Sequence, residues 1–182
     1  MTAIAERYRH LSADVTSRVD AVPAERWDDP SPCPDWTARD VLGHVLETHA
    51  AMLANVGVPT PASPVVGLDP AAAWATVRDT TQAALDDPEQ ANRIYDGHFG
   101  RMPLDQAMDA FLCFDLLIHS WDIAKATGVD ERLDAGEVTR VFADARKMGG
   151  ILRAGGVCGP EVEAPEQADE QSAMLAYLGR RP

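Results

Sequence analysis

The sequence lacks the usual marks of a membrane-bound or secreted protein. It has no run of about 18 apolar residues, which a helix needs to cross a bilayer. Its first ten residues, MTAIAERYRH, carry charges where a signal peptide needs an apolar stretch. Only three cysteines occur, an odd number that favours free thiols in a reducing compartment over a disulfide framework. We therefore expect a cytoplasmic protein with no membrane partner.

Positive charge is also scarce. The chain has 16 Lys and Arg residues against 29 Asp and Glu, a formal net charge of −13. Such a surface repels phosphate groups, so a nucleic-acid partner is not expected. The sequence contains no C-x-x-C pair, no glycine-rich nucleotide loop and no G-x-S-x-G. These absences argue against a zinc ribbon, a nucleotide-binding fold and a serine hydrolase of that type.

What the chain does have is helical periodicity along most of its length. The 182 residues, 46% of them hydrophobic, suit one domain, which we expect to span residues 1–182. An extended pair is expected around Gly97 and Gly100, and an irregular tail over 149–165. These patterns predict an all-α fold, an antiparallel four-helix bundle with a short additional C-terminal helix. The expected helices are an N-terminal one with its apolar stripe from Ile4 to Val19, then 38–56, 70–87, 103–128, 134–148 and 168–178.

The helix expected before Gly128 carries the main chemical signal. Apolar residues surround it almost completely, which is typical of a buried helix. Yet Asp115, His119 and Asp122 share one face, at i, i+4 and i+7. A buried carboxylate must be paired or bound to a metal. The pattern fits two alternatives, a structural Asp–His hydrogen bond or a pair of metal ligands one turn apart.

The helix expected at 38–56 contains two histidines. Its apolar face is centred on Val41, Val45 and Met52, and His49 projects near the middle of that face. His44 lies at the edge. Periodicity therefore favours His49 as the inward residue, although a hydrogen-bonded core histidine is the commoner case. Two further histidines, His10 and His98, are expected on the surface or in a loop.

Two segments together resemble a known family. SPCPDWTARDVLGHV, followed some seventy residues later by FDLLIHSWDIAKATG, resembles the DinB-like superfamily. Within that superfamily, the segments resemble more closely the branch that contains the N-terminal domain of mycothiol-dependent maleylpyruvate isomerase. The C-terminal stretch PEQADEQSAMLAYLGRRP is similar to the tail of single-domain members of that branch.

This resemblance implies a four-helix bundle that binds a divalent metal ion. Its ligands are a histidine eight residues after a tryptophan and a later carboxylate-x3-histidine pair. Counted from Trp36, these positions are His44, Asp115 and His119, so the resemblance assigns the ligand role to His44 rather than His49. The isomerase has Glu where this chain has Asp115. Zn²⁺ is the expected ion, with Ni²⁺ as a possible substitute.

The neighbours of these ligands also have expected roles, those of Trp36 and Cys33 following from the resemblance. Asp122 is expected to orient His119 or to accept a proton. His49 is expected in the core or close behind the ligands. Trp36 is expected as a core anchor, and Cys33 as a buried small residue rather than a nucleophile.

The implied activity is thiol chemistry. A metal ion with an open position can lower the pKa of a small thiol such as mycothiol, and the thiolate can then attack an electrophile. We therefore expect a metal-dependent thiol S-transferase or isomerase acting on a small molecule. The alternatives are a non-catalytic metal- or ligand-binding bundle and a purely structural His–Asp cluster. A homodimer is also expected, because relatives often pair and four tryptophans leave aromatic surface to spare.

Overall fold

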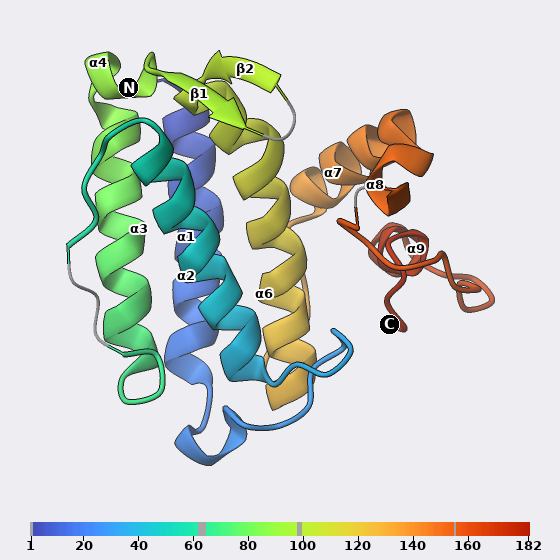
Figure 1. Cartoon of the computed structure of the whole chain (residues 1–182). Coiled ribbons are helices and arrows are strands. Elements are labelled where there is room, and N and C mark those ends of the chain that lie inside the picture. The colour runs from blue at the N-terminus through green and yellow to red at the C-terminus, as the bar shows by residue number, and fades with distance from the viewer. Residues whose placement is uncertain (1, 62–64, 98–99, 155) are drawn as a thin grey trace. The chain divides into compact units, whose positions relative to one another are not determined.

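The computed structural model describes residues 2–61, 65–97, 100–154 and 156–182 (Figure 1). His98, expected in a loop, lies outside these ranges. The described chain is mostly helical, as predicted, with one small sheet. It divides into two compact units, Met1–Asp130 and Glu131–Pro182, which are described separately below. The expectation of a single domain over 1–182 stays a prediction.

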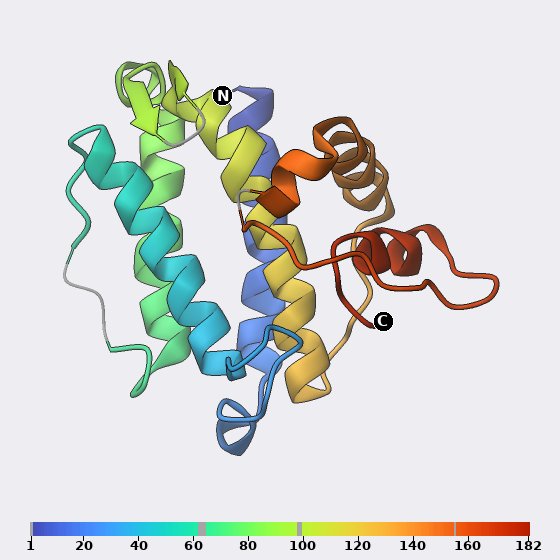
Figure 2. The ribbon, with the colours of Figure 1, turned by 45° about the vertical axis from the view of Figure 1, so that its right-hand side comes forward.

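Four long helices dominate the described part of the first unit. α1 packs against α3 and α6, and α2 packs against the same two helices. Figures 1 and 2 show all four side by side along most of their lengths. Their bounds are α1 Ala3–Ala21, α2 Ala38–Asn55, α3 Pro70–Asp86 and α6 Cys113–Thr127.

Local signals explain where these helices begin and end. At the start of α2, Thr37 and Asp40 form a reciprocal capping box, in which each side chain accepts a hydrogen bond from the other residue's backbone N–H. Asp69 caps α3, which begins with Pro70 at its first position. α6 ends at Gly128, whose φ of 73° is a left-handed conformation that glycine adopts without strain. The helix bounds expected from these residues are confirmed.

The path into α6 departs from a regular α-helix. Residues from Pro103 to Gly128 were expected to form one helix. Instead a short helix α5 (Leu104–Ala107) is followed by a π-helical segment, η2 (Met108–Leu112), and then by α6. A π-helical turn inserts extra chain and changes which side chains face inward, and such turns often lie beside functional sites. Here the segment ends three residues before Asp115.

A two-stranded antiparallel sheet forms between α4 (Pro88–Ala91) and α5. Strands β1 (Ile94–Gly97) and β2 (Gly100–Pro103) pair with Gly97 opposite Gly100, so the expected extended pair is confirmed. The Asn55 amide at the end of α2 bonds to the backbone of Asp96, which attaches β1 to that helix.

The second unit contains the remaining helices of the described chain. α7 packs against both α8 and α9, and the predictions for α7 and α9 are confirmed. The expectation that 149–165 is wholly irregular is wrong at its start, where α8 forms. Their bounds are α7 Ala135–Met148, α8 Gly150–Ala154 and α9 Glu170–Tyr177.

Two further findings bear on the expectations about a membrane partner and a homodimer. Within the described ranges no helix is both long enough and apolar enough to cross a membrane. Trp27, Trp74 and Trp121 are buried and Trp36 is half-buried. The argument that tryptophans leave aromatic surface for a homodimer is therefore wrong, and the homodimer itself stays a prediction.

Candidate metal centre

The two histidines of α2 point to different environments. His49 is fully buried, and its Nδ1 lies 2.7 Å from the carbonyl oxygen of Val45 one turn earlier. Its ring packs edge-on against Trp74, with centroids 5.6 Å apart. Periodicity therefore placed His49 correctly inside the core.

His44 lies on the side of α2 that faces α6. Its side chain is 38% exposed, and its Nε2 lies 3.4 Å from Oδ2 of Asp115. Its ring meets that of His119 edge-on, with centroids 5.1 Å apart. The structure thus brings His44, and not His49, next to the Asp–His pair of α6.

Asp115 lies between the two imidazoles. Its Oδ1 is 3.3 Å from Nε2 of His119, and its Oδ2 is the oxygen that faces His44. One donor atom from each of the three residues lies within 4.8 Å of the other two. Asp115 and His119 stand one turn apart on α6, and the packing of α2 against α6 supplies the third side chain.

The electrostatics of this cluster favour a bound positive charge. Burial alone would raise the pKa of Asp115, but the charge of His119 and hydrogen bonds from both histidines hold it below its usual value. Burial alone would lower the pKa of His119, but Asp115, aided by hydrogen bonds to neighbouring side chains, raises it well above its usual value. The cluster therefore holds a proton on His119 firmly, and a cation that replaces this proton meets the same attraction.

Asp122 fixes the ring of His119 from the other side. Its side chain is fully buried, and Oδ2 lies 2.9 Å from Nδ1 of His119. A carboxylate in this position holds the proton on Nδ1 and leaves Nε2 facing Asp115. This is the contact that an orienting role for Asp122 requires, and the role itself stays a prediction.

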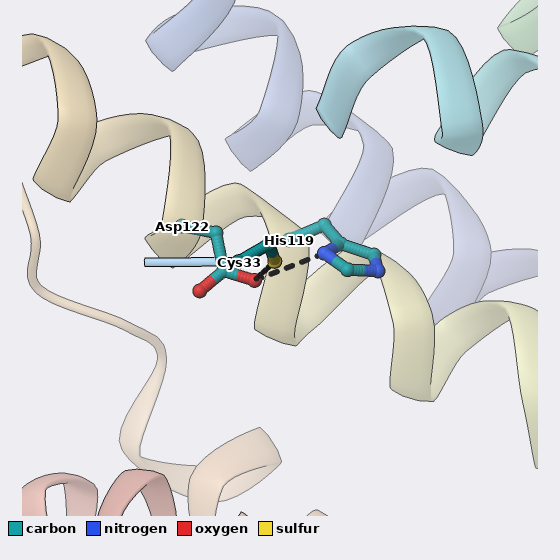
Figure 3. Close-up of side chains that lie close together, drawn as sticks. All are labelled: Cys33, His119 and Asp122. Carbon is teal, nitrogen blue, oxygen red and sulfur yellow. Dashed lines mark hydrogen bonds and ion pairs between the residues drawn. The ribbon is translucent and has the colours of Figure 1, made fainter. Parts of the chain in front are cut away.

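Cys33 also belongs to this hydrogen-bond network, although the sequence predicted only a buried small residue at this position. Its thiol donates a hydrogen bond to the same oxygen, with Sγ 3.3 Å from Oδ2 of Asp122 (Figure 3). Cys33 is half-buried rather than buried. Cys33 and Asp122 are 89 residues apart in sequence, so no local pattern could have indicated the contact.

The turn that carries Cys33 also places Trp36 over the site. The N–H of Trp36 bonds to the Cys33 carbonyl, and the N–H of Ser31 bonds to the Trp36 carbonyl. The Trp36 ring lies 5.1 Å from the His44 ring and 6.4 Å from the His119 ring, measured between centroids. Trp36 was expected as a core anchor; the structure instead makes it a half-exposed wall of the site.

The donor set fits a small divalent ion. Ligand atoms about 2.0–2.1 Å from a tetrahedral Zn²⁺ lie roughly 3.3 Å from one another. Oδ1 of Asp115 lies 3.3 Å from Nε2 of His119, and its other oxygen, Oδ2, lies 3.4 Å from Nε2 of His44, so each imidazole has a carboxylate oxygen at about this separation. Two imidazoles and one carboxylate leave a fourth position free for water or substrate, as in catalytic zinc sites. The residues therefore suit the expected ion, whose binding stays a prediction.

Comparison with known proteins gives one family and a few relatives. The family described as mycothiol maleylpyruvate isomerase N-terminal domain matches residues 8–124, which include all the residues of the cluster. Uncharacterized proteins from two strains of Mycobacterium tuberculosis are each 28% identical over 163 residues, covering 87% of this chain and 87% of their own. Another uncharacterized protein of that species is 42% identical over 48 residues, or 26% of this chain and 19% of its own. No solved structure matches the chain significantly.

Proposed function

The chain belongs to the mycothiol maleylpyruvate isomerase N-terminal domain family, and on that premise we propose that it binds a divalent metal ion and uses it to activate a small thiol. The observation that carries this proposal is the convergence of His44, Asp115 and His119 from two helices, with donor atoms within 4.8 Å of one another. The proposal assigns the fold to the DinB-like type, with α1, α2, α3 and α6 as its antiparallel four-helix bundle.

The three converging residues are the proposed metal ligands. His44 and His119 offer Nε2, and Asp115 offers a carboxylate oxygen, a combination that suits Zn²⁺ and also accepts Ni²⁺. Asp122 holds the Nδ1 proton of His119 and so keeps Nε2 available as a donor. When bound, the ion supplies Lewis acidity that lowers the pKa of a coordinated thiol, so that a thiolate exists at neutral pH.

The exposure of these residues suits a small substrate. His44 is the most exposed ligand, at 38%, whereas Asp115 and His119 are 21% and 10% exposed. Solvent and ligands therefore reach the cluster from the His44 side. Trp36 borders both imidazoles and offers an apolar ring face against which a thiol or electrophile can pack.

The proposed reaction joins a low-molecular-weight thiol such as mycothiol to a small electrophile. The thiol loses its proton to solvent, and its sulfur forms a bond to an electrophilic carbon. If that carbon carries a leaving group, the carbon–sulfur bond replaces the bond to that group and the outcome is S-transfer. If the carbon belongs to an activated double bond, addition followed by rotation and loss of the sulfur gives isomerisation. We place this activity in the cytoplasm.

The direct test is thiol-dependent consumption of an electrophile by the metal-loaded protein. Activated double-bond and alkyl-halide compounds are offered with several small thiols, and disappearance of the electrophile is followed by mass spectrometry. Turnover that needs both thiol and metal, and that is lost in His44→Ala, supports the proposal. Metal binding without any turnover would make the chain a non-catalytic metal- or ligand-binding bundle.

A further inference from the structure

The side chains of Cys33, Asp122 and His119 form a second group of donor atoms on the far side of the His119 ring. One ligand atom from each lies within 4.8 Å of the other two. Figure 3 shows the Cys33 sulfur and a nitrogen of His119 directed at one oxygen of Asp122. Sulfur, imidazole and carboxylate together suit a cation that prefers thiolate ligands.

We propose that Cys33, His119 and Asp122 form a binding site for a thiophilic cation, here called the Cys33 site. A cation in this site removes His119 from the first donor set, which is the cluster of His44, Asp115 and His119. That this cation excludes a metal ion from the first donor set rests on the proposed function, whereas the Cys33 site itself does not.

The site is prearranged. His119 and Asp122 are fixed by α6 at i and i+3, and the turn from Ser31 to Trp36 is closed by backbone hydrogen bonds. The N–H of Cys33 also bonds to the Ser31 hydroxyl, which holds the sulfur in position. The donor atoms now stand at hydrogen-bond distances, Sγ at 3.3 Å and Nδ1 at 2.9 Å from Oδ2. Around a tetrahedral ion of the size of Zn²⁺ the sulfur and the oxygen must separate by roughly 0.2 Å more, which a half-buried turn can supply. The nitrogen and the oxygen must separate by roughly 0.4 Å more, which needs small rotations of the His119 and Asp122 side chains.

The negative charge of Asp122 favours a cation in place of the thiol proton of Cys33. Asp122 is fully buried, and its carboxylate accepts a hydrogen bond from the Cys33 thiol and faces Nδ1 of His119. A cation that takes the place of the Cys33 proton, which passes to solvent, satisfies the same carboxylate and gains a thiolate ligand.

Ions in the two donor sets exclude each other because each needs a different nitrogen of His119. Nε2 faces Asp115, in the first donor set, and Nδ1 faces Asp122, in the second. A neutral imidazole has one nitrogen with a lone pair and one with a proton. A cation held through Nδ1 displaces the proton from that nitrogen to solvent, so the neutral ring carries its proton on Nε2. This protonated nitrogen can donate a hydrogen bond to Asp115 but cannot ligate a metal. Each ion thus requires the tautomer that the other one forbids.

Cadmium is the probe, because thiolate-to-cadmium charge transfer gives an ultraviolet absorption band that histidine and carboxylate ligands do not give. Cd²⁺ is titrated into metal-stripped protein. We expect the band in the wild type and in His44→Ala, which removes a ligand of the first donor set and none of the Cys33 site. We expect its loss in Cys33→Ser, whose hydroxyl can replace the thiol hydrogen bond to Asp122. Cys158→Ser changes the other half-buried cysteine and should keep the band. No band in the wild type, or an unchanged band in Cys33→Ser, overturns the site.

The exclusion is tested on protein loaded with Co²⁺, whose visible absorption reports the first donor set. The cadmium band should grow only as the cobalt absorption falls, and Cys33→Ser should need more Cd²⁺ for the same fall. Growth of the cadmium band with the cobalt spectrum intact contradicts the exclusion. A protein that binds no Co²⁺ but shows the Cys33-dependent band contradicts the exclusion and the proposed function, while supporting the Cys33 site.

Discussion

The Nδ1 atom of His119 lies 2.9 Å from a carboxylate oxygen of the fully buried Asp122, so the opposite nitrogen of the same ring faces Asp115. This relationship fixes the orientation of an imidazole that we propose as a metal ligand. Without it the imidazole could carry its proton on either nitrogen, and only one of the two tautomers can bind a metal at Nε2.

The first prediction concerns this orientation. Asp122→Asn removes the charge that holds the Nδ1 proton, and its amide can instead donate to Nδ1. Metal affinity should fall by about 10- to 100-fold, the usual cost of losing a partner behind a metal-bound histidine. Competition with a chelating dye measures the affinity, and circular dichroism checks the fold. Asp79→Asn, on the exposed surface of α3, is the matched control. An unchanged affinity in Asp122→Asn would show that Asp122 is only a structural partner.

The second prediction concerns the carboxylate ligand. Asp115→Asn keeps the side-chain size but removes the negative charge, so the ion would be held by two neutral imidazoles. The metal affinity should fall by more than roughly 100-fold, which is the largest loss expected when a residue that only hydrogen-bonds to a ligand is removed. The helices should remain folded. Asp115→Glu should retain the ion, because it restores a carboxylate that is one methylene longer. Metal content by mass spectrometry separates the two variants. Full metal content in Asp115→Asn would favour a structural Asp–His pair instead.

The third prediction concerns acid stability. Burial lowers the pKa of His49 to about 4, although a hydrogen bond to Val45 and the charge of Asp115 act in the opposite direction. Below about pH 6.5 the unfolded chain takes up a proton that the folded chain refuses. The free energy of unfolding should therefore be unaffected by His49 above that pH and should fall as the pH drops towards 4. The full loss attributable to this group is about 3 kcal/mol.

Urea unfolding of metal-stripped protein at about pH 7.5 and about pH 4.5 measures this effect. In His49→Gln, which cannot take up the proton, the difference in stability between the two pH values should shrink. His10→Gln, at an exposed histidine, should reproduce the wild-type difference. An equal pH dependence in the wild type and in His49→Gln would show that His49 is protonated in the folded state.

The fourth prediction concerns assembly. The family resemblance still favours a homodimer through helix faces away from the metal cluster. The buried tryptophans give it no support. Light scattering at tens of micromolar protein, a range typical for specific association, should give twice the mass of one chain. A single-chain mass at that concentration would refute the homodimer.

Local patterns predicted much of the fold. The Thr37–Asp40 capping box gave the start of α2, and Gly128 gave the end of α6. The π-helical segment before α6 was not predicted, because inserted chain within a helix leaves the apolar pattern nearly unchanged.

The site was harder to predict than the fold. Periodicity placed Asp115, His119 and Asp122 on one face and put His49 in the core. It could not show which α2 residue reaches α6, because that depends on how the two helices pack; the family resemblance supplied His44. Neither source gave Cys33 its contact with Asp122, since a turn and a helix 89 residues later meet only in the folded chain.

The central claim is that His44, Asp115 and His119 hold one divalent ion, and paired substitutions on α2 test it most directly. His44→Ala and His49→Ala remove histidines from the same helix, one beside Asp115 and one in the core. Each protein is purified with the wild type, and its bound metal is measured by mass spectrometry beside its circular dichroism spectrum. We predict about one ion per chain in the wild type and in His49→Ala, and almost none in folded His44→Ala. Metal retained in His44→Ala and lost in folded His49→Ala would contradict the assignment.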